Sequence, residues 1–430
     1  MISHPLKATV RRYFPSLTHR NFLLFWTGQG VSVIGTWMQN VGQAWLVLQL
    51  TNSPLKLGIV SAMQFLPVMV LSLVAGPFVD RYPKRKMIIF TQTSLMLLAL
   101  ILATLTLLHV VQYWHIVVLA LLLGLVNTID IPTRQAFVIE LAGREDLMNA
   151  ISLNSTVFNM ARIFGPAVAG ILIGAIGIAP CFYLNGISFL AVIISLFFIR
   201  VPDFPGSPAA GSAAPPAVHR GLFDGVLASI REGLAYIARK PTILFPLVLM
   251  ALLSTFVMNY NIFVPTFAKI DLHGDATTFG FLMTAMGVGS FLGAFTLTVR
   301  SAGVRKVRQI ILGGLGMSTF LAISGMQRGF LLSCALLAVT GYFSVTFAAS
   351  CNGHIQSESE DGMRGRVMSV YSLVFGGVTP IGSLYAGNLV DVVGPGACMI
   401  VSGGIGFVAT MWMALAAGRR RRRAALARGL

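Results

Sequence analysis

Two ionisable side chains, Asp130 and Arg162, lie inside long apolar stretches of this sequence, where a charge is costly unless it is paired. Asp130 has two candidate partners: Arg162 on another apolar stretch, and Arg134 four residues further along its own. A carboxylate in such a pair can be purely structural, or it can take up and release a proton. We expect structural pairing in preference to proton transfer, and all three residues are candidates for coupling.

Uncharged polar side chains form a second group within the apolar stretches. In residues 22–50 they recur at steps of three and four, which places them on one face of a helix. In a membrane such a face should contact protein or a water-filled cavity, so the set could bind solute or could only join helices. The cavity candidates are Gln29, Ser32, Thr36, Asn40, Gln43, Ser155, Asn159, Asn259, Tyr260, Asn261, Tyr371, Thr379 and Ser383. Uncharged polar groups beside Met and Phe suit an amphipathic or neutral solute better than a sugar phosphate.

The elements that must position these residues are membrane-spanning helices. A helix rises 1.5 Å per residue, so about 20 apolar residues cross the hydrocarbon core of a bilayer. Hydrophobic residues make up 56% of the chain and charged residues 10%, a composition that excludes a water-soluble domain. We predict an all-α integral membrane protein with twelve spans. They are residues 22–50, 56–79, 87–109, 114–137, 153–176, 179–200, 242–268, 277–299, 307–327, 329–351, 367–391 and 396–417.

The net charge of +17 is spread unevenly over the loops between these spans. Nearly all Lys and Arg residues lie in the two tails and in every second loop, which is the positive-inside pattern with both termini in the cytoplasm. A nucleic-acid-binding protein would instead gather them on one folded face, so that class is excluded. We expect the run Arg419–Arg423 to lie on anionic lipid headgroups.

The chain divides into two similar halves. Residues 201–240 begin as a Pro-, Ala- and Ser-rich linker and continue as an amphipathic segment, predicted to be a helix on the inner membrane surface. A constant offset carries Lys84 onto Lys306 and Lys86 onto Arg308, which favours a duplicated six-helix unit. The predicted parts are an N-terminal tail (1–20), a six-helix bundle (21–200), the linker (201–240), a second bundle (241–417) and a basic tail (418–430).

Two motifs point to conformational change. The loop after the second span contains Gly76, Asp80, Arg81, Lys84 and Arg85, a small residue followed by an acid at a helix end and a basic cluster. The fifth span contains Gly165, Pro166 and Gly170; proline removes a backbone hydrogen bond and the glycines permit a bend and close packing.

The loop motif resembles the signature of the major facilitator superfamily, G-x-x-x-D-[RK]-x-G-[RK]-[RK], with Pro83 in place of its second glycine. The resemblance implies a cytoplasmic latch that holds the outward-facing state and a fold of two six-helix bundles. Gly165, Pro166 and Gly170 resemble the G-P-x-x-G element of exporters. The stretches around Asp130 and Arg366 are similar to those of an exporter branch that includes enterobactin exporters. The chain also resembles drug/proton antiporters of the same superfamily.

These observations predict a secondary active transporter that works by alternating access and exports small amphipathic, drug- or siderophore-like compounds. Protons are a candidate coupling ion on the resemblance alone. A facilitative importer or uniporter of a neutral solute stays open, as does a channel. No P-loop, HExxH, GxSxG or zinc-like Cys spacing is present, so we expect no enzyme activity, cofactor or metal. The expected partners are the bilayer and a small molecule, for a monomer in a bacterial inner membrane.

Overall fold

The protein's computed structural model describes residues 14–80, 82–143, 145–199, 222–300 and 306–426, and all regular elements in these ranges are helical. The N-terminal half contains η1 (Pro15–Thr18), α2 (Arg20–Thr51), α3 (Pro54–Asp80), α4 (Lys84–Leu107), α5 (Tyr113–Ala142), α6 (Leu147–Ile176) and α7 (Ala179–Phe198). The C-terminal half contains α8 (Leu222–Arg239), α9 (Pro241–Phe256), α10 (Tyr260–Thr266), η2 (Phe267–Asp271), α11 (Ala276–Arg300), α12 (Lys306–Gly325), α13 (Phe330–Glu358), α14 (Asp361–Gly377), α15 (Thr379–Val393) and α16 (Pro395–Leu426).

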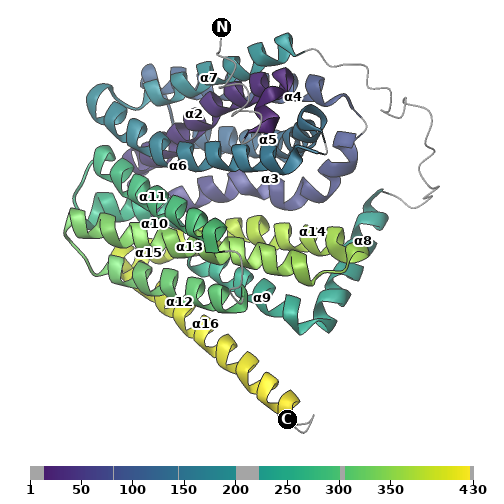
Figure 1. Ribbon diagram of the computed structural model, residues 1–430. Helices are drawn as coiled ribbons and strands as arrows, with labels where there is room; N and C mark the ends of the chain where they lie inside the picture. Colours follow the sequence, from purple (N-terminus) through teal and green to yellow (C-terminus); the bar gives the residue numbers. More distant parts are fainter. Residues whose placement is uncertain (1–13, 81, 144, 200–221, 301–305, 427–430) are drawn as a thin grey trace, which may run out of the picture.

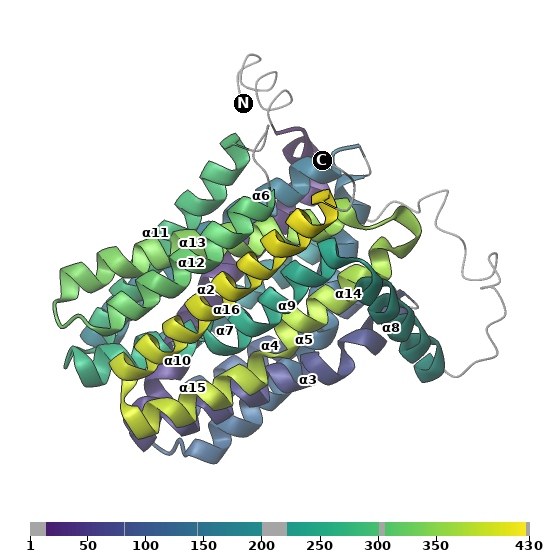
Figure 2. The ribbon, with the colours of Figure 1, turned by 90° about the horizontal axis from the view of Figure 1, so that it is seen from below.

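The two halves lie side by side as two helical layers. In Figure 1 the N-terminal helices, purple to blue, form the upper layer and the green to yellow C-terminal helices the lower one. Their backbones are closest where α3 packs on α15 and α6 packs on α11. Seen from below, in Figure 2, α8 lies beside α14 at one end of the bundle. The predicted arrangement of two helical bundles lying side by side is therefore present in the structure.

The helices match the predicted spans closely in position. Eleven spans in the described chain are long and apolar enough to cross a membrane, and large exposed side chains such as Phe90, Leu331 and Trp412 face outward from them. The first predicted span, α2, is long enough at 32 residues but is not among the eleven. The polar residues on one face of α2 (Gln29, Ser32, Thr36, Asn40 and Gln43), here called its polar stripe, lower its hydropathy. A count of twelve spans therefore stays a prediction.

Two predicted spans are broken helices. The seventh span divides into α9 and α10, between which Asn259 turns its amide back to the Thr255 carbonyl oxygen (2.7 Å). The eleventh span divides at Val378 into α14 and α15, and Pro380 lies in the first turn of α15, where its missing N–H needs no partner. By contrast, α6 runs without interruption through Pro166. Broken spans leave backbone groups that can face a cavity, which is where membrane proteins tolerate them.

The C-terminal tail also differs from its predicted form. The helix α16 continues past residue 417 as far as Leu426 because the alanines and arginines there have high helix propensity. The amphipathic segment of the linker is helical, as α8, and its Gly233 and Ile237 are buried. The ion pair between Glu232 and Arg366 (3.1 Å) ties α8 to α14. Its position on the membrane surface stays a prediction.

Candidate functional site

A cavity lies between the two halves. It contains about 620 Å³ of space, part of which is open to solvent, and its lining comes from α2 and α3 of one half and from α10 and α11 of the other. The lining residues are Trp37, Asn40, Val41, Gln43, Ala44, Leu57, Val60, Ser61, Gln64, Phe65, Asn261, Phe279 and Met283. None of these carries a charge. Amides and one hydroxyl supply hydrogen-bonding groups among aromatic and aliphatic walls, the mixture typical of small-molecule sites.

Three of the predicted cavity residues, Asn40, Gln43 and Asn261, line this cavity. Gln43 donates from Nε2 to Oε1 of Gln64 (3.4 Å), which joins α2 to α3. Ser383 lies just behind the wall, with its hydroxyl 3.0 Å from that of Ser61. Asn261 is the second residue of α10, directly after the break in the seventh span. The break therefore places an amide from the C-terminal half opposite the polar stripe of α2.

The other predicted cavity residues lie elsewhere, and four of their side chains bond to backbone carbonyl oxygens. Ser32 is buried, the exposed Thr36 bonds to its carbonyl oxygen (3.0 Å), and Gln29 has a buried Oε1 without a hydrogen-bond partner. Asn159 donates to Ser155. Tyr260 and Asn259 are buried, Tyr371 donates to Ala348 (3.5 Å), and Thr379 begins α15. Helical spacing identified the polar face of α2 correctly, but only its later part, with Asn40 and Gln43, lines the cavity.

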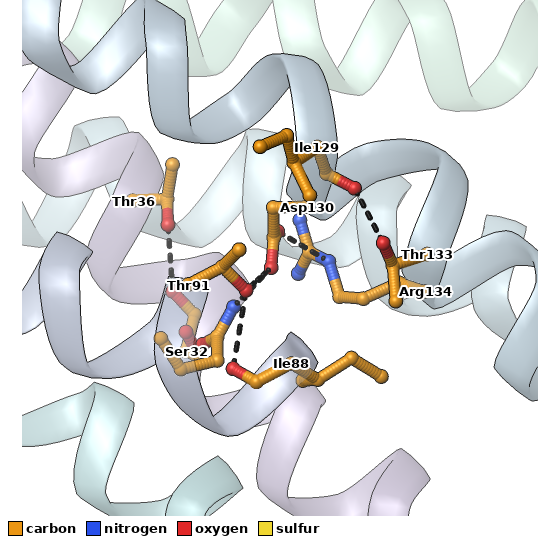
Figure 3. Close-up of polar contacts among 9 residues, drawn as sticks. Ser32, Thr36, Ile88, Thr91, Ile129, Asp130, Thr133 and Arg134 are labelled. Atoms are coloured by element: carbon orange, nitrogen blue, oxygen red, sulfur yellow. Dashed lines mark hydrogen bonds and ion pairs between the residues drawn. The ribbon is translucent and has the colours of Figure 1, made fainter. Parts of the chain in front are cut away.

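Asp130 is the centre of a buried polar cluster between α4 and α5, shown in Figure 3. Its side chain is 0% exposed, and its Oδ1 accepts hydrogen bonds from Thr91 Oγ1 (2.6 Å) and Gln92 Nε2 (3.0 Å). Its Oδ2 forms an ion pair with Nε of Arg134 (2.7 Å), one turn away on the same helix. Of the two predicted partners, the structure therefore has Arg134, because the i,i+4 spacing brings the groups together before any tertiary contact is needed.

Arg162 does not pair with Asp130, so that alternative is wrong for this conformation. Its Nη2 donates to Oδ1 of Asn159 (2.9 Å), one turn earlier on α6, and its Nε is buried without a hydrogen-bond partner. Two hydrogen-bond donors and the ion-paired Arg134 guanidinium already surround the Asp130 carboxylate. Arg162 is consequently left without an acidic partner among the described residues.

Glycines bring the two halves into backbone contact at the helix ends opposite the basic loops, here called the outer ends. A Cβ atom at Gly280 of α11 would lie 2.6 Å from the Pro166 carbonyl oxygen and 2.8 Å from Gly170 Cα on α6. At Gly58 of α3 it would lie 2.5 Å from the Ser383 carbonyl oxygen on α15. Gly170 of the predicted kink motif thus serves close packing between the halves, while Gly165 packs against Trp37.

Two polar contacts join the halves at the same outer ends, and we call them the outer clasp. Lys269 of η2 donates from Nζ to the Leu48 carbonyl oxygen near the end of α2 (2.6 Å). Asp391 of α15 accepts from Ser53 Oγ (3.2 Å) and from the Leu55 amide at the start of α3 (3.3 Å). The cation thus lies at a helix C-terminus and the anion at a helix N-terminus, which the helix dipoles favour. Neither pairing could be predicted from residue types or spacing.

The predicted latch lies partly outside the described residues. Arg81 is not described, nor are the side chains of Gly76 and Asp80, which belong to the last turns of α3. Lys84 and Arg85 begin α4, and Arg85 Nη2 donates to the Phe197 carbonyl oxygen at the end of α7 (3.5 Å). The latch function stays a prediction.

Residues 12–424 match the model of a family described as transmembrane secretion effectors. The chain belongs to this family. It is 26% identical over 374 residues to the multidrug efflux pump Tap of Mycolicibacterium fortuitum, covering 85% of this chain and 87% of Tap. It is 23% identical over 406 residues to the enterobactin exporter EntS of Citrobacter koseri, covering 94% of each chain. The predicted resemblance to a major facilitator exporter branch is therefore confirmed.

The fold agrees with this assignment. The crystal structure of the nucleoside transporter NupG superposes with a TM-score of 0.71 at 11% identity and covers 92% of this chain and 98% of NupG. The protein is a multi-pass membrane protein and a secondary transporter for small compounds, as predicted. Family and relatives also support the prediction that it is not an enzyme.

Residues that sequence reasoning missed form most of the cavity wall. Trp37, Phe65, Phe279 and Met283 line it, yet the sequence holds 29 Phe and 19 Met residues, most of which could face lipid. Gln64 carried a usable signal, since an amide within an apolar stretch is costly in lipid. The aromatic residues carried none, because lipid and an apolar cavity wall favour the same side chains.

Proposed function

We propose that this transporter exports small amphipathic compounds from the cytoplasm by alternating access, with protons as the coupling ion. The observation that carries the proposal is the cavity shared by both halves, with the close glycine contacts and the outer clasp at the same, outer ends of its helices. By the positive-inside rule the basic loops are cytoplasmic, so this conformation is closed toward the outside. Opening the outer contacts would expose the cavity to the opposite face.

The lining supports an amphipathic cargo. Trp37, Phe65 and Phe279 offer flat apolar surface, and Gln43, Gln64 and Asn261 offer both donors and acceptors. A cavity of this kind binds an aromatic or alkyl body and orients it through a few hydrogen bonds. Relatives named for multidrug and enterobactin export favour drug-like and siderophore-like compounds.

Proton coupling is proposed for Asp130. This carboxylate is fully buried, and its Arg134 partner is 21% exposed, so protonation would release a cation that water can reach. The cluster joins α4 to α5 within the N-terminal half, and loss of the charge would loosen that contact. The latch residues Asp80, Arg81, Lys84 and Arg85 are proposed to hold the opposite, outward-facing state by contacts on the cytoplasmic side.

Energised inside-out vesicles provide the test. Dyes, antibiotics and siderophores are added one at a time while the proton gradient is followed, with wild type compared with Asp130→Asn at matched protein levels. We expect some compounds to dissipate the gradient in the wild type and not in the variant. Saturable transport without dissipation would replace proton antiport with facilitated transport, and flux that never saturates would indicate a channel.

A further inference from the structure

Arg162 lies at the middle of the membrane-spanning helix α6, which runs from Leu147 to Ile176. A guanidinium at this depth is normally paired with an acid or faces a water-filled cavity. Here one amide oxygen, that of Asn159, accepts from Nη2, while Nε is buried and has no hydrogen-bond partner. Buried polar groups without partners are rare in folded proteins, so this one calls for an explanation.

The protein cannot supply the missing negative charge at this depth from its described residues. Asp130, the acid nearest the middle of a span, is already paired with Arg134 and accepts two further hydrogen bonds. Other described acids on the spanning helices lie within two residues of a helix end, as Glu140 and Asp391 do. None of the described residues therefore supplies a counter-charge for Arg162, and a bound molecule can.

The position of Arg162 links it to the cavity. Phe158 and Gly165, about one turn before and one turn after it on α6, both pack against Trp37 of the cavity wall; the Phe158 and Trp37 ring centroids are 5.6 Å apart. The backbone carbonyl of Arg162 lies against Gly287 of α11, where the two halves meet. The arginine is thus next to the wall of the cavity and on the boundary between the halves.

We propose that Arg162 binds an acidic group of the transported compound. This inference rests on the proposed export function and narrows its substrate class to amphipathic acids, which join an aromatic or amide-rich body to a carboxylate. The uncharged cavity would hold the body, and the guanidinium would hold the acid. Nε and one Nη form the edge of a guanidinium that takes a carboxylate with two parallel hydrogen bonds, and Nε is the atom left free here.

Matched pairs of probes that differ only in charge test this assignment. Binding of 1-naphthoate and 1-naphthamide, and of salicylate and salicylamide, is measured by thermal stabilisation of the purified protein in micelles at neutral pH. We expect the wild type to bind at least one acid about tenfold more tightly than its amide, as a charge-assisted hydrogen-bond pair provides. In Arg162→Gln the ratio should fall to about one, while Arg162→Lys should keep part of it.

Arg328→Gln is the matched control because it removes the same charge from a side chain that is 62% exposed and paired with Asp271. It should keep the full preference for the acid. Equal binding of acid and amide by the wild type, binding of neither, or an unchanged preference in Arg162→Gln overturns the proposal. A variant that fails to fold is recognised because it shows no melting transition like that of the wild type when no probe is present. If Arg162→Gln fails in this way, the acid-to-amide binding ratio of Arg162→Lys tests the proposal instead.

Transport separates this inference from the export function. Accumulation of each probe is measured in energised inside-out vesicles containing wild type or Arg162→Gln. If the wild type accumulates the amides without preferring the acids, the export function stands and the role of Arg162 fails. If it binds the acids selectively but accumulates no probe and no compound of the wider panel, the site stands and the export function fails.

Discussion

Replacing Asp130 with asparagine removes one charge from the buried cluster and keeps its shape. The amide oxygen can still accept from Thr91 and Gln92, but its NH₂ group then faces the Nε donor of Arg134. Removing one partner of a buried ion pair costs about 3–5 kcal/mol. The Arg134 side chain is 21% exposed, so water offsets part of this loss. We expect Asp130→Asn to lower the free energy of unfolding by about 2–3 kcal/mol, somewhat less than the full loss of a buried pair.

The pair is tested by a double-mutant cycle. Unfolding of purified wild type, Asp130→Asn, Arg134→Gln and the double variant is followed with denaturant in mixed micelles. The second substitution removes the group that the first left unpaired. The destabilisation of the double variant should therefore be smaller than the sum of the two single destabilisations, and the difference should be about 1–2 kcal/mol. Thr133→Val is the control, because the Thr133 hydroxyl bonds to the Ile129 carbonyl oxygen of its own helix and not to the Asp130 carboxylate. Loss of that bond should lower the free energy of unfolding by only about 1 kcal/mol.

Two results would refute this reasoning. A change below about 0.5 kcal/mol in Asp130→Asn would mean that the carboxylate is not held by these contacts or is already protonated. Strict additivity in the cycle would mean that Asp130 and Arg134 do not interact, whatever their distance. The cycle also serves the vesicle experiment, since it shows how far a loss of coupling in Asp130→Asn reflects loss of structure.

Three further changes have outcomes that follow from the structure. Gly280→Val places a side chain against α6 and should keep the outer ends of the two halves apart. Transport should fall more than tenfold, and labelling of a cysteine introduced near the clasp should rise. Gly404→Val is the control, because Gly404 has open space around it, and it should change neither quantity. Asn261→Ala should raise the KM for transported compounds several-fold without lowering the melting temperature, because its side chain faces the cavity; an unchanged KM would exclude it from the site. The hydrogen bond from Lys240 lowers the pKa of Glu360 below its ordinary 4.5, and the same bond raises the pKa of Lys240 above 10.5. This pair should stabilise the fold between those two values and lose its effect as pH falls through the lowered pKa or rises through the raised one, so melting temperatures of wild type and Glu360→Gln should converge in acid.

The parts of this molecule that the sequence predicts well are those governed by one element at a time. Span positions follow from apolar length, and the pairing of Asp130 with Arg134 follows from helical spacing. The polar stripe of α2 is likewise real, and Asn40 and Gln43 reach the cavity from it. Each of these needs only the geometry of a single helix.

The parts that could not be predicted depend on which helices meet. Ser32 lies on the same stripe as Asn40, yet its own neighbours bury it and the cavity begins further along. The outer clasp joins Lys269 to Leu48 and Asp391 to Leu55, residues far apart in sequence and unremarkable in type. Likewise, Arg162 is a candidate partner of Asp130 in the sequence only because both are rare charges in apolar stretches, and rarity does not establish contact.

The two kinds of contact between the halves differ in what they contribute to switching. The clasp places single charges at helix ends, an arrangement worth about 0.3–1 kcal/mol for each charge near water. The glycine contacts bring backbones together along α3 with α15 and α6 with α11, and no long side chain needs to be reordered when they part. Contacts that are individually weak and easily remade keep the two states within a few kcal/mol of each other. A cargo bound between α2, α3, α10 and α11 contacts both halves, so its binding can shift that balance, whereas binding to one half alone could not.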